Sequence, residues 1–489
     1  MKTISTIRKF AAAALIMLAA ACDKEKTTPD NPEKGDDDRP EIVKENPVLP
    51  PAQMRGAWMA TVWGIDWPAG DYSQGGQKKV YTDYLDLYKS LGINAVFFQV
   101  RGMADAFYSS SYEPWSRYIT GTPGKDPGYD VLRFLIDEAH KRGIEFHAWM
   151  NPYRIATTSY FSEGLSPMIP ESMVKKYSGI WVYNPALPEV RERIAGIVRE
   201  LVTRYPDIDG IHMDDYFYPS GSAIGNGLDD SAEYSKYGSG YSSIEDFRRG
   251  NIFEMVKLVK NTLLSVSPEI AYTLGPQGNY NNNYNSQYID VPAVCSAKLI
   301  DAVIPQLYWS TQANTDYYTP RLDWWSQNVS STPLMIGHTL SGFKSDESGK
   351  GWSSATEFET QCSLAAQKNV SGHLIYNSST LKENPKGVQS NIKRAFSRKA
   401  LMPHLGGTSA DAPVPVPQNL VISGGELHWD KVEEASCYAV YLSNGNNKTA
   451  TLLDVTADLS YPLSSKGKYF VTALNRHNAQ SGISDILKY

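Results

Sequence analysis

The pattern of apolar and polar positions between residues 55 and 400 alternates between two kinds of segment. Short apolar runs, typical of strands, are each followed by a longer segment whose apolar residues recur at helical spacing. Glycines such as Gly92 and Gly143 follow two of these helical segments and mark their ends. The predicted strands are residues 55–63, 95–101, 145–152, 208–219, 270–275, 302–309, 333–340 and 372–377. The predicted helices are residues 78–91, 129–142, 187–205, 244–266, 291–300, 316–329, 355–367 and 385–400.

This strict alternation of strands and helices defines the expected fold class. Short strands that are apolar on both faces are typical of a parallel sheet covered by helices. Repeated strand–helix units of this number predict an α/β fold, a (β/α)8 TIM barrel, over residues 49–403. In such a barrel the functional site lies at the carboxyl ends of the strands.

The texture of the sequence changes after the last predicted helix. Residues 404–416 are rich in Gly, Ser and Pro, which is typical of a linker. Residues 417–489 contain short strand-like runs separated by Gly and Asn turns, which predicts a small all-β sandwich. The order of its apolar and aromatic residues resembles a fibronectin type III module. The segment contains no acid pair or metal-like cluster, so we expect it to act as a spacer or weak binding module.

The N-terminus has the pattern of an export signal. Three basic residues precede an apolar run at residues 10–21, which is too short to span a bilayer as a helix. The run ends at Cys22 and resembles a bacterial lipoprotein signal, residues 1–22, cut before a cysteine that is then acylated; an ordinary cleaved signal peptide is the alternative. Residues 23–48 are charged and poor in apolar residues, so we expect a flexible tether. The expected location is the cell envelope, lipid-anchored to the outer membrane and facing either the periplasm or the surface.

Net charge and cysteine usage exclude several partners. A net charge of −6 argues against nucleic acid, because nothing in the sequence is basic enough to hold phosphates. Cys295, Cys362 and Cys437 have no CxxC or metal-like spacing, so we expect free and mostly buried thiols. The sequence also has no HExxH motif and no phosphate-binding glycine loop, so we expect neither a metal nor a cofactor.

Polar and aromatic residues gather where the predicted strands end, as a glycan cleft requires. Aromatic rings stack on the apolar faces of sugars, and amides and hydroxyls bind their hydroxyl groups. Several of these residues, His147 and His212 among them, have a structural role within the barrel as the alternative. The residues expected to bind substrate are Trp63, Asp66, Arg101, Asp105, His147, Asn151, Arg154, His212, Tyr216, Gln306, Tyr308 and Trp309.

The fourth predicted strand ends on the candidate catalytic acids, Asp214 and Asp215. Consecutive residues on a flat strand point to opposite faces. If Asp214 points into the barrel mouth, Asp215 therefore points toward the surrounding helices. Both side chains reach the cleft only if the strand has already bent, which the segment from Tyr216 to Pro219 permits. We expect at least one of the two to be catalytic.

A resemblance to a known family extends over nearly the whole barrel, from residue 55 to about 395. The matching segments are residues 55–56, 65–68, 94–101, 126–130, 137–143, 147–149, 151–154, 209–212, 214–218 and 305–309. Together they resemble the glycosyl-hydrolase-like 10 family. The resemblance implies hydrolysis of glycosidic bonds in a polysaccharide. It also implies, as the leading substrate, peptidoglycan glycan strands that have been stripped of their stem peptides.

Two mechanisms are compatible with a strand that ends on two acids. In the common scheme one carboxyl is the acid and a second, about 5 to 9 Å away, is the nucleophile or base. Asp66, Asp105 and Glu113 are then candidates for the second acid. In a substrate-assisted scheme the N-acetyl group of the sugar attacks, and an adjacent Asp pair orients that group and donates the proton. The later strands end on no clear second acid, which favours the adjacent pair.

Other functions remain open from the sequence. A non-catalytic glycan-binding lipoprotein would also keep the aromatic residues and would use the aspartates as hydrogen-bond acceptors. Within the same enzyme class, the substrate could be another extracellular polysaccharide. A serine or cysteine hydrolase of stem peptides is disfavoured, because no GxSxG motif is present and the cysteines lack partners.

Overall fold

The computed structural model describes residues 41–157, 164–177, 179–219, 229–312, 317–345, 351–406, 413–445 and 448–489. The predicted signal peptide, Cys22 and most of the predicted tether lie outside the described residues. Within the described ranges, none of the helices has the length and apolar character needed to cross a bilayer.

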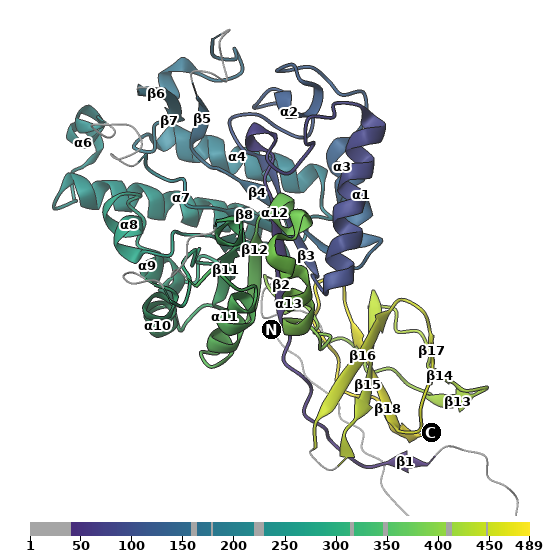
Figure 1. The fold of residues 1–489 in the computed structure, drawn as a ribbon. Coiled ribbons are helices and arrows are strands. Elements are labelled where there is room, and N and C mark those ends of the chain that lie inside the picture. Colours follow the sequence, from purple (N-terminus) through teal and green to yellow (C-terminus); the bar gives the residue numbers. More distant parts are fainter. Residues whose placement is uncertain are drawn as a thin grey trace, which may run out of the picture. The chain divides into compact units, whose positions relative to one another are not determined.

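Eight parallel strands form the barrel predicted from the sequence (Figure 1). In sheet order they are β10 (Ala302–Val303), β9 (Ala271–Leu274), β8 (Gly210–Met213), β4 (Glu145–Met150), β3 (Ala95–Arg101), β2 (Met54–Met59), β12 (Gly372–Tyr376) and β11 (Met335–Thr339). Isolated parallel bridges from Val303 to Leu334 and from Gln306 to Gly337 connect the two edges of this sheet. The (β/α)8 prediction is therefore confirmed, and the carboxyl ends of the strands lie at one end of the barrel.

The helices that follow the strands agree with the helical spacing in the sequence. Ser243 begins the longest of them by accepting a hydrogen bond from Asp246 N–H. Gly92, at φ 75°, ends the first one in the left-handed conformation. These helices are α1 (Gln74–Leu91), α3 (Val131–His140), α4 (Pro188–Arg204), α7 (Ile244–Val266), α9 (Val291–Ser296), α10 (Tyr318–Asn328), α11 (Thr356–Ala366) and α13 (Val388–Ala395). Shorter helices are α2 (Arg117–Thr120), α6 (Ser231–Tyr237), α8 (Tyr280–Asn285) and α12 (Ser378–Glu383).

The alternation of side chains along each strand divides the barrel core into two layers. Residues such as Phe97 and Leu374 point inward and pack with each other in the centre of the barrel. Their neighbours Phe98 and Ile375 point outward and pack under the helices. This parity decides which strand residues can reach the mouth of the barrel.

Two parts of the barrel differ from the predicted elements. Residues 302–309 form only a two-residue strand, because Pro305 has no N–H for the sheet and the chain turns at Pro305. After β4 the chain adds a small antiparallel sheet that the sequence pattern does not predict. Its strands are β5 (Arg154–Thr157), β7 (Ile180–Tyr183) and β6 (Val174–Tyr177).

The C-terminal residues form two antiparallel sheets, in agreement with the all-β prediction. One contains β13 (Val421–Ser423), β14 (Glu426–His428) and β17 (Ser460–Pro462). The other contains β16 (Ala450–Thr456), β15 (Cys437–Ser443), β18 (Lys468–Leu474), β19 (Ile486–Lys488) and β1 (Ile42–Val43). β1 belongs to the segment expected to be a flexible tether, yet it pairs with β19 as an edge strand. Assignment of these sheets to the fibronectin type III class stays a prediction.

Candidate active site

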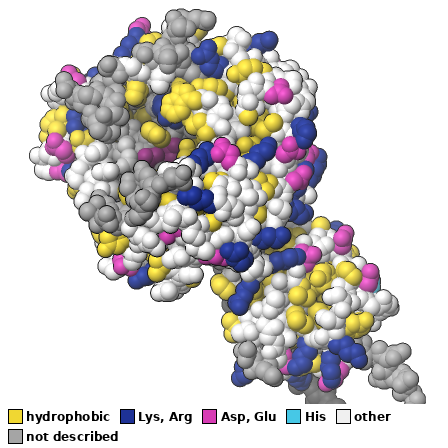
Figure 2. Space-filling view, viewed as in Figure 1, with side chains coloured by type: hydrophobic (Ala, Val, Ile, Leu, Met, Phe, Trp, Pro, Cys, Tyr) yellow, Lys and Arg dark blue, Asp and Glu magenta, His cyan; other side chains and the backbone are white. Residues whose placement is uncertain are grey.

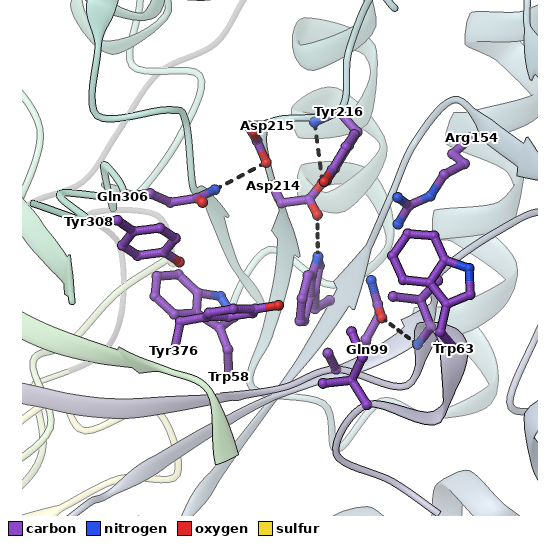
Figure 3. A pocket seen from close by; sticks show the side chains of 14 residues that line it. Trp58, Trp63, Gln99, Arg154, Asp214, Asp215, Tyr216, Gln306, Tyr308 and Tyr376 are labelled. Atoms are coloured by element: carbon purple, nitrogen blue, oxygen red, sulfur yellow. Dashed lines mark hydrogen bonds between the residues drawn. The ribbon is translucent and has the colours of Figure 1, made fainter. Parts of the chain in front are cut away.

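A pocket of about 190 Å³ lies at the carboxyl ends of the barrel strands. Figure 3 shows its side chains converging from several strand ends around the two acids that follow β8. In Figure 2, hydrophobic side chains gather beside a hollow on the barrel with acidic side chains inside it. The residues that line the pocket are Trp58, Ala60, Val62, Trp63, Ile65, Gln99, Trp149, Arg154, Asp214, Asp215, Tyr216, Gln306, Tyr308 and Tyr376.

Both candidate acids line this pocket. His212 on β8 points into the barrel, so alternation directs Asp214 inward as well. β8 ends at Met213, before the acid pair, so strict alternation does not hold for the next residue. Asp215 therefore also reaches the pocket, where Gln306 Nε2 donates a hydrogen bond to its Oδ1 at 3.1 Å.

Asp214 is buried and tightly held, with only 3% of its surface exposed. Trp149 Nε1 donates to its Oδ2 at 3.0 Å, and Asn151 Nδ2 donates to the same oxygen. Burial, followed by the negative charge of Asp215, raises the pKa of Asp214 to about 7. The Arg154 guanidinium and the two hydrogen bonds oppose this rise. A carboxyl with this pKa can hold a proton near neutral pH and release it during a reaction.

Asp215 is less deeply buried than its neighbour. Burial raises its pKa, while hydrogen bonds from Gln306 and Gln277 oppose the rise. Gln306 also donates to Gly275 O at 2.8 Å, which fixes the direction of its amide. Two adjacent buried carboxyls repel each other when both are ionised, so the pair retains one proton more readily than isolated acids would.

A network of amides fixes the donors that surround Asp214. Gln99 Oε1 accepts from the N–H groups of Thr61 and Val62 at 3.0 and 2.9 Å. Its Nε2 therefore points the other way and donates to Asn151 Oδ1 at 3.1 Å. Because Asn151 Oδ1 is used as the acceptor, its Nδ2 faces Asp214. The carboxylate is thus oriented by residues of three strand ends before any ligand binds.

Aromatic rings form the walls of the pocket. Tyr308 and Tyr376 stack with their ring centroids 5.7 Å apart. Trp63 and Tyr216 are 57% and 46% exposed, so their ring surfaces remain available to a ligand. The Arg154 guanidinium lies 5.6 Å from the centre of the Trp63 ring and 4.4 Å from that of Tyr216. Positive charge, rings and carboxyls therefore share one small volume.

Asp66, predicted both to bind substrate and to be a candidate second acid, does not line the pocket. Its Oδ2 accepts from Ala60 N–H and its Oδ1 from Ser379 N–H, both at 2.7 Å. Burial raises its pKa to about 6, and these hydrogen bonds oppose the rise. The side chain connects the end of β2 to the start of α12, which is a structural role.

Arg101, Asp105 and Glu113 also lie outside the pocket lining. A register shift between β3 and β4 at Gln99 and Arg101 marks a bulge that redirects the Arg101 side chain. Arg101 forms a buried two-point ion pair with Glu113, with N–O distances of 2.6 and 2.7 Å. Asp105 is buried as well. The structure therefore places all three outside the set of side chains that line the pocket.

The remaining predicted binding residues lie below or beside the pocket. His212 accepts a hydrogen bond from Trp58 Nε1 at 3.1 Å, and burial lowers its pKa far below the usual range. His147 stacks on Phe97 with the ring centroids 4.4 Å apart. Trp309 does not line the pocket, although its neighbour Tyr308 does. The two histidines lie beneath the pocket, where His212 holds Trp58 and His147 packs on Phe97.

Seven residues of the pocket lining were not predicted as site residues, and the polar or aromatic ones among them are Trp58, Gln99, Trp149 and Tyr376. Each lies within a predicted strand rather than just beyond its end. Strand parity was the available signal: Gln99 and Trp149 lie two residues before Arg101 and Asn151, which were predicted. The inward face of a barrel strand therefore contributes a second layer of residues beneath its end.

The fold and the site together define a glycoside hydrolase: a (β/α)8 barrel with paired carboxyls and aromatic walls at its strand ends. The family model described as "Glycosyl hydrolase-like 10" matches residues 53–353. The chain belongs to this family.

Two relatives extend the match. "Glycosyl hydrolase YngK" of Bacillus subtilis (strain 168) is 34% identical over 477 residues, which cover 88% of this chain and 92% of that protein. "Glycosyl hydrolase DigH" of Escherichia coli (strain K12) is 34% identical over 331 residues, which cover 61% of this chain and 75% of the relative. Among solved structures, the catalytic domain of β-amylase from Paenibacillus polymyxa covers 72% of this chain and 100% of its own at a TM-score of 0.47 and 11% identity, a likeness too weak to inform the site.

Proposed function

We propose that this glycoside hydrolase cleaves peptidoglycan glycan strands that have lost their stem peptides, and that Asp214 and Asp215 carry the reaction. The observation that supports this most directly is the acid pair itself. Among the described residues that line the pocket, these two are the carboxylic acids. The other candidates for a second acid lie outside the pocket lining: Asp105 is buried, Asp66 accepts hydrogen bonds from backbone N–H groups, and Glu113 is paired with Arg101.

An adjacent acid pair without a distant partner favours the substrate-assisted mechanism. In that mechanism the carbonyl oxygen of the sugar's N-acetyl group attacks the anomeric carbon as the glycosidic bond breaks. One carboxyl of the pair gives its proton to the leaving oxygen, and the other, as carboxylate, orients the acetamido N–H. Both sugars of peptidoglycan carry an N-acetyl group, so the substrate supplies the nucleophile.

Arg154 gives a physical reason for preferring stripped strands. Stem peptides are joined to the lactyl group of the muramic sugar through an amide, and their removal leaves a free carboxylate there. Arg154 lines the pocket between Trp63 and Tyr216. Its Nε and Nη2 already donate to Gly102 O and Asn151 Oδ1, and its Nη1 can pair with such a carboxylate. An intact peptide at that position would carry no charge at the amide, so it could not form this ion pair.

The test uses three substrates: intact peptidoglycan, peptide-stripped strands, and stripped strands whose lactyl carboxylates have been converted to amides. We expect soluble saccharides, read by mass spectrometry, from the stripped strands only. Amidation should slow release by about 10–100-fold, the loss expected for one hydrogen bond to a charged group. Arg154→Gln should slow cleavage of the stripped strands more than that of the amidated strands, so the difference of about 10–100-fold between the two substrates should shrink in this variant. Cleavage of intact peptidoglycan at the same rate would contradict the proposal, as would an absence of cleavage of stripped strands.

The raised pKa of Asp214 predicts the pH dependence of the reaction. The carboxyl that protonates the leaving group must carry a proton, and the pKa of about 7 means that this proton is lost as the pH rises through neutrality. We therefore expect kcat/KM on stripped strands to fall about tenfold per pH unit above pH ~7. The measurement is a kcat/KM profile over the range where circular dichroism shows a folded protein. A rate that stays constant up to about pH 9 would exclude a carboxyl acid with this pKa.

We also propose a location for the enzyme. An acylated Cys22 would hold the barrel at the outer membrane of the cell envelope, where glycan strands are accessible.

A further inference from the structure

A cluster of two histidines and one cysteine lies on the outer face of the barrel, beneath α11. β11 and β12 are neighbours, with Ile336 opposite His373 and His338 opposite Ile375. Met335 and Leu374 point into the barrel centre, so His338 and His373 point outward. Cys362 on α11 lies close to both histidines. None of the three lines the active-site pocket, so the proposed reaction assigns them no role.

The potential ligand atoms of His338, Cys362 and His373 all lie within 4.8 Å of one another. His338 Nε2 is 3.0 Å from His373 Nδ1. Both histidines are fully buried, and Cys362 is half-buried. The sequence gives no sign of this group, because the three residues belong to three separate elements and have no motif spacing.

The tautomer of His338 is fixed by its other ring nitrogen. Gln361 Nε2 donates to Trp309 O at 3.1 Å and to Glu357 Oε1 at 2.9 Å. Gln361 Oε1 is therefore an acceptor, and it takes the Nδ1 proton of His338 at 2.7 Å. The Nε2 lone pair of His338 consequently faces His373 and Cys362. A metal-binding imidazole is normally oriented in this way, through a hydrogen bond from its second nitrogen.

We propose that His338 Nε2, His373 Nδ1 and Cys362 Sγ bind one zinc ion. Two imidazoles and one thiolate form a ligand set that zinc prefers, at distances of about 2.0–2.3 Å. Ligand atoms around a tetrahedral zinc ion lie roughly 3.3–3.8 Å apart by that geometry, so small side-chain adjustments complete the site. A cavity of about 470 Å³, lined by Cys362 and His373 among others, gives the ion access and leaves room for water as the fourth ligand.

Zinc binding changes the protonation of two of the three ligands. His373 Nδ1 now donates to His338 Nε2, so its proton must leave and His373 must adopt the Nε2–H tautomer. Cys362 loses its thiol proton, and one proton per zinc ion is released to solvent. The bound ion would connect α11 to two barrel strands, and we expect it to stabilise this side of the barrel rather than to take part in hydrolysis.

The full chain, treated with a chelator and then dialysed, provides the test. We expect it to bind one equivalent of zinc in competition with a chromogenic chelator. Cobalt as a spectroscopic probe should give a thiolate-to-cobalt charge-transfer band. Cys362→Ser should abolish this band, whereas Cys295→Ser, a matched change at a buried barrel cysteine, should leave it intact. Gln361→Leu should weaken zinc binding roughly 10–100-fold, because it removes the hydrogen bond that orients His338.

Two results would overturn the proposal. One is the absence of one-equivalent zinc binding in the wild-type chain. The other is a charge-transfer band that persists in Cys362→Ser. If that variant does not fold, X-ray absorption of the zinc-loaded wild-type chain decides between the outcomes: one sulfur and two imidazole nitrogens support the site, and any other first coordination sphere excludes it. Zinc loading should leave the hydrolysis of stripped strands unchanged.

Discussion

Asp214→Asn and Asp215→Asn are each expected to lower kcat on peptide-stripped strands by about 10²–10⁴-fold, the usual contribution of a positioned acid or base. Asparagine keeps the size of aspartate but can neither donate a carboxyl proton nor carry the negative charge that orients an acetamido group. Asp83→Asn is the matched control, since it makes the same change at a carboxylate on α1 that is 42% exposed. The measurement is saccharide release per enzyme under saturating substrate, with thermal unfolding to show that each variant is folded.

Aryl glycosides of N-acetylglucosamine then assign the two roles. A good leaving group needs no proton, so the variant that lacks the acid should retain most of its rate on an activated aryl glycoside. The variant that lacks the orienting carboxylate should lose activity on both substrates, because the acetamido group still has to attack. Equal loss by both variants on both substrates would contradict a division of roles within the pair. Full activity of either variant on stripped strands would remove that residue from the mechanism.

The alternation of strands and helices was sufficient to predict the barrel because apolar periodicity directly reflects burial. β3 and α7 have the predicted bounds, residues 95–101 and 244–266. The small sheet of β5, β6 and β7 escaped prediction because its strands are short, antiparallel and inserted into one loop. The last predicted helix is shorter than expected, since Asn384, Lys386 and Gly387 adopt positive φ before α13 begins. Such turns depend on local packing that periodicity does not report.

The sequence was sufficient to predict where the candidate site lies, but it predicted only some of the residues that line it. The strand-end rule correctly located residues such as Arg154, Tyr216 and Gln306 at the pocket. It also predicted Asp66 and Arg101, which lie outside the pocket lining with their polar groups bound by backbone N–H groups and by Glu113. A carboxylate that binds substrate and one that holds two loops together look alike in a sequence, because the difference lies in which partners the fold brings to them.

The buried ion pair of Arg101 and Glu113 supports the active site from beneath, and breaking it should have the largest effect on stability. Their side chains are only 2% and 1% exposed. Arg101 also donates to Asn151 O, and the side chain of Asn151 in turn donates to Asp214. Arg101→Met leaves a buried carboxylate without its partner, which should lower the free energy of unfolding by about 3–5 kcal/mol.

The exposed pair of Lys79 and Asp83 on α1 provides the comparison. Its side chains are 74% and 42% exposed, so Lys79→Met should change the free energy of unfolding by less than about 1 kcal/mol. The measurement is the urea midpoint of barrel unfolding for both variants. The double variant Arg101→Met with Glu113→Leu should recover part of the loss, because it removes the unpaired charge as well as the pair. A similar midpoint for Arg101→Met and Lys79→Met would mean that water reaches Glu113 and screens its unpaired charge.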